Sequence, residues 1–335
     1  MYRAVITRCG QCPSKIRKLM ANTKRNTTAR RKAYRSSGSG SGAAKATSGG
    51  MVSAATTKKN VGRKAAKGKA AVGKPGELVI KKMPRKRNGT VRVLSWNIQG
   101  THDSASALSA GANKRSAKVK TVAKVVAQAE PDLMILQEVA GGKTSVFEKE
   151  LRKALPKGYT ASSSHDQPQS KGQRYLTVHK TDTKVSFGSF DDFSKTSLSK
   201  KKLQPFDENV AKRSRKPATI EVKMGTKKFR AATWHAPHGG LLEARSANQQ
   251  YSSHLSATKK SPDVFVGDLN IKSGEVRTTY GLNASSMSSK KFDHVISMGG
   301  KQVTTVTGLP TLESLKAHFG WQVSDHSMVG GDVEL

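Results

Sequence analysis

Cysteine is almost absent from this chain of 335 residues. Its two cysteines, Cys9 and Cys12, form a single C-x-x-C close to the amino end, so no disulfide can link the parts of the long region that follows. A lone C-x-x-C is a weak zinc signal without a second pair, and a weak redox signal without a surrounding βαβ pattern. We therefore interpret it as incidental.

Long apolar runs are also missing. No stretch approaches the roughly 20 residues of a membrane-spanning helix, and no apolar segment typical of a secretory signal peptide is present. We therefore expect no membrane span. The basic amino-terminal region favours a nuclear or nucleoid location over an organelle, although its composition is also compatible with a transit peptide. The compartment stays open.

Acidic residues are scarce. The chain has 60 Lys and Arg against 23 Asp and Glu, which gives a formal charge of +37 at pH 7. Residues 1–90 hold 24 of these bases and one acid, Glu77, and residues 91–335 keep a charge of +14. This excess indicates a polyanionic partner, with nucleic acid favoured over an acidic membrane. A lysine-rich surface that is simply solvated is the alternative, and the oligomeric state stays unknown.

The first 89 residues lack the apolar side chains that a core requires. They contain a Gly/Ser-rich run at 36–50, a Lys/Ala/Gly-rich stretch at 58–75 and a basic cluster of nuclear-localisation type at 81–87. Such a composition is typical of disorder. We predict a disordered basic tail over residues 1–89 and one folded domain over residues 90–335.

Beyond residue 90 the pattern of apolar residues alternates between strands and helices. Strands are expected at 91–97, 133–139, 175–179, 218–224, 229–234, 264–268, 292–297 and 328–334, and helices at 114–129, 146–155 and 241–255. Strands in mixed order with helices between them predict an α/β domain. Two sheets packed between helices is one such arrangement.

The segment Val264–Asn270 is the most informative motif. Its apolar run predicts a buried strand that a glycine ends, and Asp268 and Asn270 then lie two residues apart, on the same side if the strand persists. Because burying a carboxylate is expensive, Asp268 is expected at the open end of the strand beside a cation or a donor. A second cluster places Asp325 next to His326.

Four further polar residues fall at predicted strand ends: Asn97, Glu138, His235 and Asp293. Hydrolysis of a phosphate ester requires an activated water, a sink for the charge on the phosphoryl oxygens, and stabilisation of the leaving alkoxide. Hard divalent cations prefer carboxylate and amide oxygens. Histidine transfers protons near neutral pH when a partner orients it. The pattern predicts a metal-assisted hydrolase of phosphate esters.

Six motifs in order over residues 91–335 carry a family resemblance: SWNIQG, DLMILQEV, TWHAPHGG, VFVGDLN, KFDHVIS and SDHSMV. Together they resemble the endonuclease/exonuclease/phosphatase superfamily. Within it the chain most resembles pancreatic deoxyribonucleases and the catalytic subunits of cytolethal distending toxins. The fold implied by the resemblance is a four-layered α/β sandwich of two mixed β-sheets between helices, with the site at the top of the two sheets.

The resemblance also implies a metal site. Glu138, helped by Asn97, would bind Mg²⁺, with Mn²⁺ or Ca²⁺ able to substitute or assist. Asp268 and Asn270 would hold metal, phosphate or the attacking water. Asp325 would be a metal ligand or a partner in proton transfer.

The same resemblance implies the proton-transfer and substrate groups. His235 and His326 would flank the scissile phosphate, one in water activation or leaving-group protonation and the other in charge stabilisation. Asp293 would belong to the catalytic group by orienting His326. Asn97 would contact the substrate. Arg174 would either contact a substrate phosphate or be a solvated strand residue.

Two features depart from the pancreatic enzymes. Gln173 stands where those enzymes place a Glu that orients the first histidine, and an uncharged amide cannot stabilise an imidazolium by charge. The partner of His235 is therefore open. Ala140 and Lys171 stand where those enzymes have a minor-groove Arg and Tyr, so DNA contacts are expected to rely on the basic segment 212–216.

We therefore predict a Mg²⁺-dependent phosphodiesterase that hydrolyses nucleic acid, with DNA favoured over RNA, as an endonuclease. The first alternative is a phosphatase or sphingomyelinase of the same superfamily acting on a phospholipid or phosphoinositide headgroup. The basic domain and the lack of an apolar docking run argue against it. The second is a non-catalytic nucleic-acid-packaging protein, which has no use for metal-ligand residues. Nicking and double-strand cleavage both stay open.

Overall fold

The computed structural model describes residues 78, 80–103, 109–141, 145–167, 172–193, 215–238, 241–281, 285–287, 292–298 and 301–334. Lys69–Leu335 form one compact unit. Most of the predicted disordered tail, including both cysteines, lies outside the described residues, as do Lys171 and residues 212–214 of the basic segment. None of the described helices is both long and apolar enough to cross a membrane.

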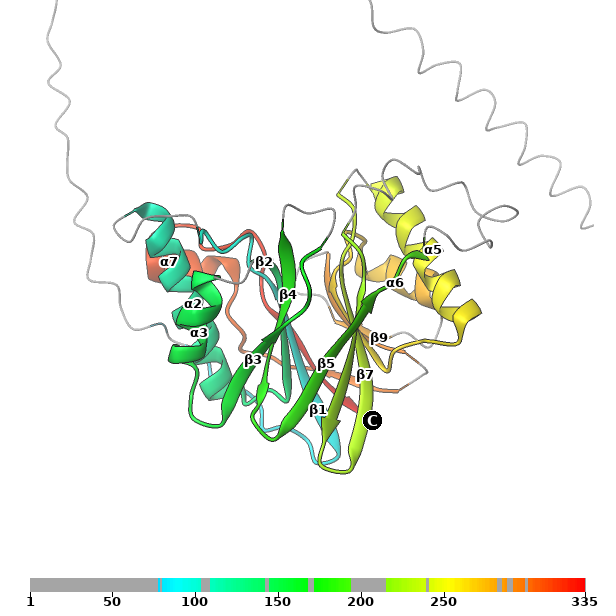
Figure 1. The fold of residues 1–335 in the computed structure, drawn as a ribbon, viewed down its shortest axis with the longest axis horizontal. Helices are drawn as coiled ribbons and strands as arrows, with labels where there is room; N and C mark the ends of the chain where they lie inside the picture. Colours follow the sequence, from blue (N-terminus) through cyan, green and yellow to red (C-terminus); the bar gives the residue numbers. More distant parts are fainter. Residues whose placement is uncertain are drawn as a thin grey trace, which may run out of the picture. The chain divides into compact units, whose positions relative to one another are not determined.

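Two six-stranded sheets form the centre of the domain (Figure 1). Sheet A has the order β11-β12-β1-β2-β4-β3, and its strands are β1 (Thr90–Asn97), β2 (Leu133–Ala140), β3 (Tyr159–Ser163), β4 (Gln173–Lys180), β11 (Val303–Thr305) and β12 (Val329–Glu334). Sheet B has the order β5-β6-β7-β8-β10-β9, and its strands are β5 (Thr183–Phe190), β6 (Ala218–Met224), β7 (Lys227–His235), β8 (Val264–Asp268), β9 (Ser285–Met287) and β10 (Asp293–Ser297). Both sheets are mixed, because β1 runs parallel to β2 and β7 runs parallel to β8.

Helices cover the two outer faces. Those over sheet A are α2 (Ala110–Ala129), α3 (Val146–Ala154) and α7 (Leu312–Phe319), and those over sheet B are α5 (Leu241–Thr258) and α6 (Ser273–Tyr280). In Figure 1 the first group lies on the left, the sheets lie in the middle, and the second group lies on the right. The predicted four-layered α/β sandwich of two mixed β-sheets between helices is confirmed.

The layer between the sheets changes from apolar to polar along the strands. Successive side chains of a strand point to opposite faces, so every second residue enters this layer. On β1, Val91 and Val93 pack between the sheets, and Asn97 lies on the same face at the strand's end. On β8, Val264 and Val266 take the same course and Asp268 follows. Polar residues of both sheets therefore gather at one end of a shared core.

The sequence pattern does not predict six elements, namely β3, β5, β9, β11, α6 and α7. Several of them carry little apolar signal. The five residues of β3 read YTASS, and β5 alternates apolar and polar residues only until Gly188. Pairing with β4 and β6 places them in the sheets. Tertiary contacts therefore decide these elements.

The domain begins before residue 90, which corrects the predicted boundary. Leu78 and Ile80 are buried in the core between α2 and sheet A. The ammonium of Lys86 lies 2.8 Å from the Asp132 carboxylate, and Arg92 donates a hydrogen bond of 2.9 Å to the carbonyl of Pro84. Two apolar residues in a basic segment are a weak sequence signal, and only the packing shows that they belong to the core.

We expect a chain that starts at Thr90 to be less stable than one that starts at Lys69. The longer chain keeps Leu78 and Ile80, and full burial of one such side chain stabilises by roughly 1.5–3 kcal/mol. The difference in the free energy of unfolding should therefore be about 3 kcal/mol or more, measured by urea denaturation of both chains. Equal unfolding midpoints would show that residues 78–89 do not pack on the domain.

Candidate active site

Six of the predicted site residues meet at the polar end of the layer between the sheets: Asn97, Glu138, His235, Asp268, Asp293 and His326. Five come from the ends of β1, β2, β7, β8 and β10. The sixth follows α7 on the segment that leads into β12. Both sheets therefore contribute to one cluster.

Asn97 joins the carboxylates of the two sheets. Its Nδ2 donates to Glu138 Oε1 at 3.2 Å and to Asp268 Oδ2 at 3.3 Å. Its Oδ1 accepts the backbone N–H of Gln99 at 3.0 Å, which fixes the orientation of the amide. The side chain is fully buried, so these contacts hold it in a single position.

Glu138 reaches the site through an irregular backbone. Ordinary alternation would send its side chain away from the layer that Gln137 enters, because neighbouring strand residues face opposite sides. The pairing of β2 with β4 shifts register between Leu136 and Val139, and Glu138 has a φ of 59°. A bulge of this kind re-aims a side chain at a local conformational cost.

Asp268 is the most deeply buried carboxylate of the cluster, with 2% of its side chain exposed. Burial and the neighbouring Asp293 raise the pKa of its carboxyl group above the usual range, while His326 and Asn97 act in the opposite direction. A cation at this place would therefore be strongly favoured, because an unpaired buried charge is expensive.

His326 supplies one positive charge. Its Nδ1 lies 2.9 Å from Asp293 Oδ2, and its Nε2 lies 3.5 Å from Asp268 Oδ2 and 3.4 Å from Asp325 Oδ1. Burial lowers the pKa of the imidazole, but the hydrogen bond and charge of Asp293, with the charges of Asp268 and Asp325, outweigh it and raise the pKa to about 9. The Trp96 indole N–H also donates to the His326 carbonyl at 2.9 Å.

His235 has the opposite electrostatic environment. Burial, and next the charge of Arg215, hold the pKa of its imidazole well below its usual range. Its Nδ1 lies 3.2 Å from Glu138 Oε1 without forming a hydrogen bond, and its Nε2 lies 3.5 Å from Asp268 Oδ2. Its backbone N–H donates to the hydroxyl of Tyr175 at 3.2 Å. The two histidines of the cluster are therefore pushed toward different protonation states.

Gln173, which the sequence places where a glutamate was expected, orients the side chain of Arg215. Gln173 Oε1 accepts from Arg215 Nε at 2.8 Å and from Nη2 at 2.6 Å. Arg215 Nη1 then lies 3.3 Å from His235 Nε2, and Nη2 lies 3.8 Å from Glu138 Oε1. The amide thus positions a guanidinium beside the histidine. In the sequence, Arg215 is only one member of a basic segment. The unusual Gln173 is the one sequence signal that a residue such as Arg215 is needed beside His235.

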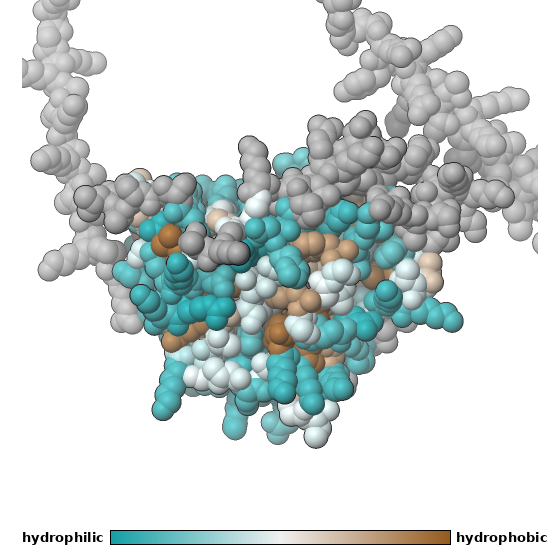
Figure 2. All heavy atoms as spheres, viewed as in Figure 1, coloured by the Kyte–Doolittle hydropathy of each residue, from teal (hydrophilic) through white to brown (hydrophobic). Residues whose placement is uncertain are grey.

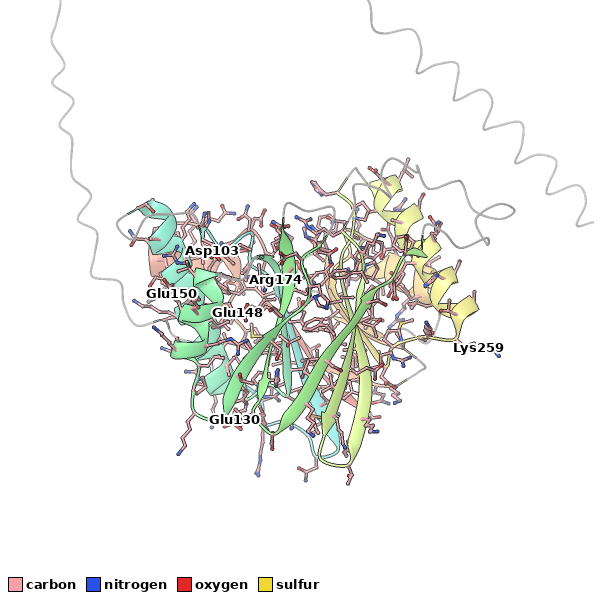
Figure 3. The ribbon with its side chains drawn as sticks, in the orientation of Figure 1. Asp103, Glu130, Glu148, Glu150, Arg174 and Lys259 are labelled. Carbon is pink, nitrogen blue, oxygen red and sulfur yellow. The ribbon has the colours of Figure 1, made fainter. Side chains whose placement is uncertain are left out.

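Arg174 does not join the cluster, although the sequence assigns it to the substrate. Its Nε and Nη2 donate to Asp166 Oδ1 at 3.0 Å and 2.6 Å, and its Nη1 donates to Ser163 Oγ at 3.0 Å. Glu148 lies 3.7 Å from the same guanidinium. Figure 3 shows Arg174 on β4 near Glu148 of α3. Its described contacts connect sheet A to this helix.

Asn270 and Asp325 lie at the margin of the cluster. The Asn270 amide donates to the Ala236 carbonyl at 2.9 Å, and its backbone N–H donates to Asp268 Oδ1 at 3.2 Å. Asn270 has a φ of 53°, so the strand geometry that would place it beside Asp268 does not persist. Asp325 is 46% exposed and touches the cluster through His326.

Gln137 is a structural residue of the site that the sequence pattern misses. Its Nε2 donates to Thr233 Oγ1 at 3.3 Å and to the Trp234 carbonyl at 3.4 Å, and its Oε1 accepts the Asp268 backbone N–H at 3.2 Å. A Cβ added at Gly267 would collide with the Trp234 carbonyl, so glycine is required at this close approach. One buried amide of sheet A thus ties together the ends of β7 and β8.

The residues of the cluster fit a divalent cation. Asp268, Asp293 and His326 lie close enough to one another to hold a metal ion. Asp293 Oδ1 is buried without a hydrogen-bond partner, and Glu138 and Asp268 meet at the amide of Asn97. Carboxylate and amide oxygens are the ligands that Mg²⁺ and related ions prefer. A bound cation would compensate the carboxylates that burial disfavours.

A four-layered α/β sandwich with carboxylates, an amide and two histidines at one edge of its sheets belongs to the class of metal-dependent hydrolases that act on phosphate esters. The sequence profile of the Endonuclease/Exonuclease/phosphatase family matches residues 94–326. The chain belongs to this family.

Solved structures show the same fold. An endonuclease/exonuclease/phosphatase from Bacteroides vulgatus is 16% identical, with a TM-score of 0.51, over 73% of this chain and 99% of that chain. A conserved protein of unknown function from Enterococcus faecalis is 14% identical, with a TM-score of 0.50, over 72% and 99%. A humanised variant of TDP2 from D. rerio is 17% identical, with a TM-score of 0.48, over 74% and 100%. No curated protein matches the sequence significantly.

We expect Gln137→Leu to destabilise the domain. The substitution leaves the Asp268 N–H without its partner in a buried place, together with the groups of Thr233 and Trp234, and each unsatisfied buried group costs about 1–3 kcal/mol. The free energy of unfolding should therefore fall by roughly 3 kcal/mol or more. Gln250→Leu is the matched control, because this buried amide makes one contact of 3.5 Å, to the Phe193 carbonyl. Equal loss in both variants, measured by urea denaturation, would contradict the assigned role.

Proposed function

We propose that the protein is a metal-dependent phosphodiesterase that cleaves nucleic acid, and specifically a DNA endonuclease. The observation that carries this proposal is the arrangement around Asp268. Its Oδ2 lies 3.5 Å from both His235 Nε2 and His326 Nε2, and Asn97 connects it to Glu138. Two proton-transfer groups and two oxygen ligands in one cluster match the requirements of phosphate ester hydrolysis.

Glu138 and Asp268 would hold the cation, with Asn97 orienting both carboxylates and Asp325 available at the rim. A bound divalent cation supplies Lewis-acid stabilisation of the phosphoryl oxygens and of the leaving oxygen. Asn97 Nδ2 is a hydrogen-bond donor within this cluster, and it would in addition donate to an oxygen of the substrate phosphate. Mg²⁺ is the proposed ion, since all these ligands offer oxygen.

The two histidines would divide the proton transfers. Asp293 accepts a hydrogen bond from His326 Nδ1 and favours the imidazolium form by charge, so His326 would protonate the leaving alkoxide and stabilise the phosphoryl charge. His235 lies beside the Arg215 guanidinium, which disfavours a second positive charge. His235 is therefore held in its neutral form, and in that form it would accept the proton of the attacking water. Asp293 acts as a positioning residue through His326.

Arg215 would add a fixed positive charge on the His235 side of the cluster. Its guanidinium is oriented by two hydrogen bonds to Gln173. Preorganised donors aimed at developing charge are a major source of catalysis in phosphoryl transfer. A glutamate at position 173 could not support this role in the same way, because its carboxylate would form an ion pair with the guanidinium and neutralise its charge.

The charge of the chain supports a polymeric substrate. The region from residue 91 onward carries +14, and the whole chain carries +37. Nucleic acid presents closely spaced phosphates, and binding releases condensed counterions. The preference for DNA over RNA rests on the resemblance to deoxyribonucleases and toxin subunits.

Incubation of the full chain with supercoiled plasmid, single-stranded RNA and a phosphoinositide, each with Mg²⁺ or with EDTA, tests the proposal. We expect Mg²⁺-dependent nicking or linearisation of the plasmid and loss of that activity in EDTA. Cleavage of the phosphoinositide alone would instead support a lipid phosphatase of the same family. Binding of DNA without any cleavage in Mg²⁺ would support a packaging protein.

We expect Glu138→Gln and Asp268→Asn each to abolish plasmid cleavage. Each replaces a carboxylate with an amide of the same shape, which removes a negatively charged ligand while leaving the packing intact. Thermal unfolding checks that both variants fold. Asp166→Asn is the control, because this acid pairs with Arg174 outside the cluster. An Asp268→Asn protein that cuts plasmid at the wild-type rate would disprove the proposed metal site.

We expect His235→Ala and His326→Ala each to lower the rate constant of cleavage about 10²- to 10⁴-fold, the usual cost of losing a general acid or base. His165→Ala serves as the control, since this side chain is exposed. Single-turnover cleavage of plasmid at saturating protein measures the effect. Variants within a few-fold of the wild type would exclude the proposed proton transfers.

A further inference from the structure

Three lysines line up across one end of sheet B, and we call them the lysine row. They are Lys184 on β5, Lys223 on β6 and Lys228 on β7. In the antiparallel register Lys184 lies opposite Lys223, and Lys223 lies opposite Lys228. Directly opposed residues project from the same face of a sheet. All three side chains are exposed.

The lysine row points away from the core between the sheets. The neighbouring residues Val222 and Phe229 pack in that core, and Val185 packs against it, so the alternating lysines face the outer side of the sheet. Its end of the sheet is opposite to the active site, because β7 runs from Lys227 to His235. At about 3.3 Å per residue, the row lies roughly 23 Å from His235 along the strand.

The row is a concentration of uncompensated charge. Like charges directly opposite each other in a sheet are destabilising. Among the described residues no acid pairs with any of the three lysines, and Glu221, the acid on the same face of β6, is engaged by Arg230 at 2.6 Å. A sheet that only needed a soluble surface would gain stability from an acid at the central position of the row.

The chemistry of the surroundings indicates the kind of partner. The residues next to the row on the same face, Ser186, Glu221 and Arg230, are hydrophilic. Figure 2 shows hydrophilic side chains projecting from the lower rim of the domain, below a group of hydrophobic residues. Binding of a membrane surface usually combines basic residues with an inserted apolar face. Within the part of the chain that the structure describes, Leu242 on α5 is the one large hydrophobic residue that is strongly exposed. A polymer of phosphates fits the row better than a lipid surface does.

We propose that the lysine row binds the phosphate backbone of nucleic acid as a second contact, separate from the active site. Neighbouring strands lie about 4.8 Å apart, so the row spans roughly 10 Å. The row would bind one segment of the nucleic acid while another segment of the same molecule is cleaved in the active site. This tethering raises the local substrate concentration. The inference rests on the proposed nucleic-acid substrate and adds to it a surface outside the catalytic cluster.

Binding measurements in EDTA test the row without any cleavage. A full-length chain with all three lysines of the row replaced by glutamine is titrated with a fluorescently labelled duplex over a range of KCl concentrations. Each lost phosphate contact lowers the slope of log affinity against log salt by about 0.9, so the slope should fall by about 2 to 3. The control replaces three other exposed lysines, Lys149 and Lys153 on α3 and Lys157 in the turn after it, with glutamine and removes the same charge. A similar loss of slope in both proteins would overturn the proposal.

A single charge reversal separates binding from folding. Lys223→Glu places an acid between the other two lysines, so the midpoint of thermal unfolding should rise while the affinity for duplex falls. Lys153→Glu is the control and should change affinity less. An unchanged affinity for duplex in Lys223→Glu would overturn the proposal. A variant that keeps its affinity for DNA but loses binding to anionic vesicles would overturn it as well. Plasmid cleavage with Mg²⁺ is measured separately. If the wild-type protein does not cleave but its salt slope depends on the lysine row, the proposed catalysis is refuted and the proposed role of the row is not.

Discussion

The structure depends on one constraint: the two sheets pack face to face through an apolar layer, while the strand ends at one side of that layer carry polar residues. Apolar side chains fill most of the layer between the sheets, and at one end this layer gives way to amides, carboxylates and imidazoles. The Gln137 amide crosses the layer there and satisfies backbone groups of Trp234 and Asp268. Because a buried unsatisfied group is costly, this crossing also fixes how the two halves of the cluster sit together.

Electrostatics then assigns different characters to similar side chains. Asp268 is nearly fully buried, which would be unfavourable in isolation, and His326 and Asn97 offset part of that cost. His326 is surrounded by carboxylates, whereas His235 shares its surroundings with a guanidinium. Two imidazoles within one cluster are thereby pushed in opposite directions. The backbone irregularity at Glu138 contributes to the same cluster, since a regular strand would have pointed that carboxylate away from it.

Charge is arranged at several levels in this protein. Inside the cluster, the uncharged amide of Gln173 holds the Arg215 guanidinium by two hydrogen bonds. On the outer face, the Arg174 guanidinium is engaged by acids and links a helix to its sheet. Basic residues thus differ in their tasks according to burial and partners. A count of lysines and arginines therefore does not show which of them are available to a phosphate.

The sequence by itself determined the α/β class, the principal strands and the polar residues at their ends, because strand periodicity and metal-ligand chemistry are local signals. The tertiary structure decided what depends on contacts between distant residues. It turned Glu138 into the cluster, engaged Arg174 in ion pairs, and brought Arg215 beside His235. It also moved the start of the domain into the basic segment at 78–89, where only packing against the core distinguishes two apolar residues from a tail.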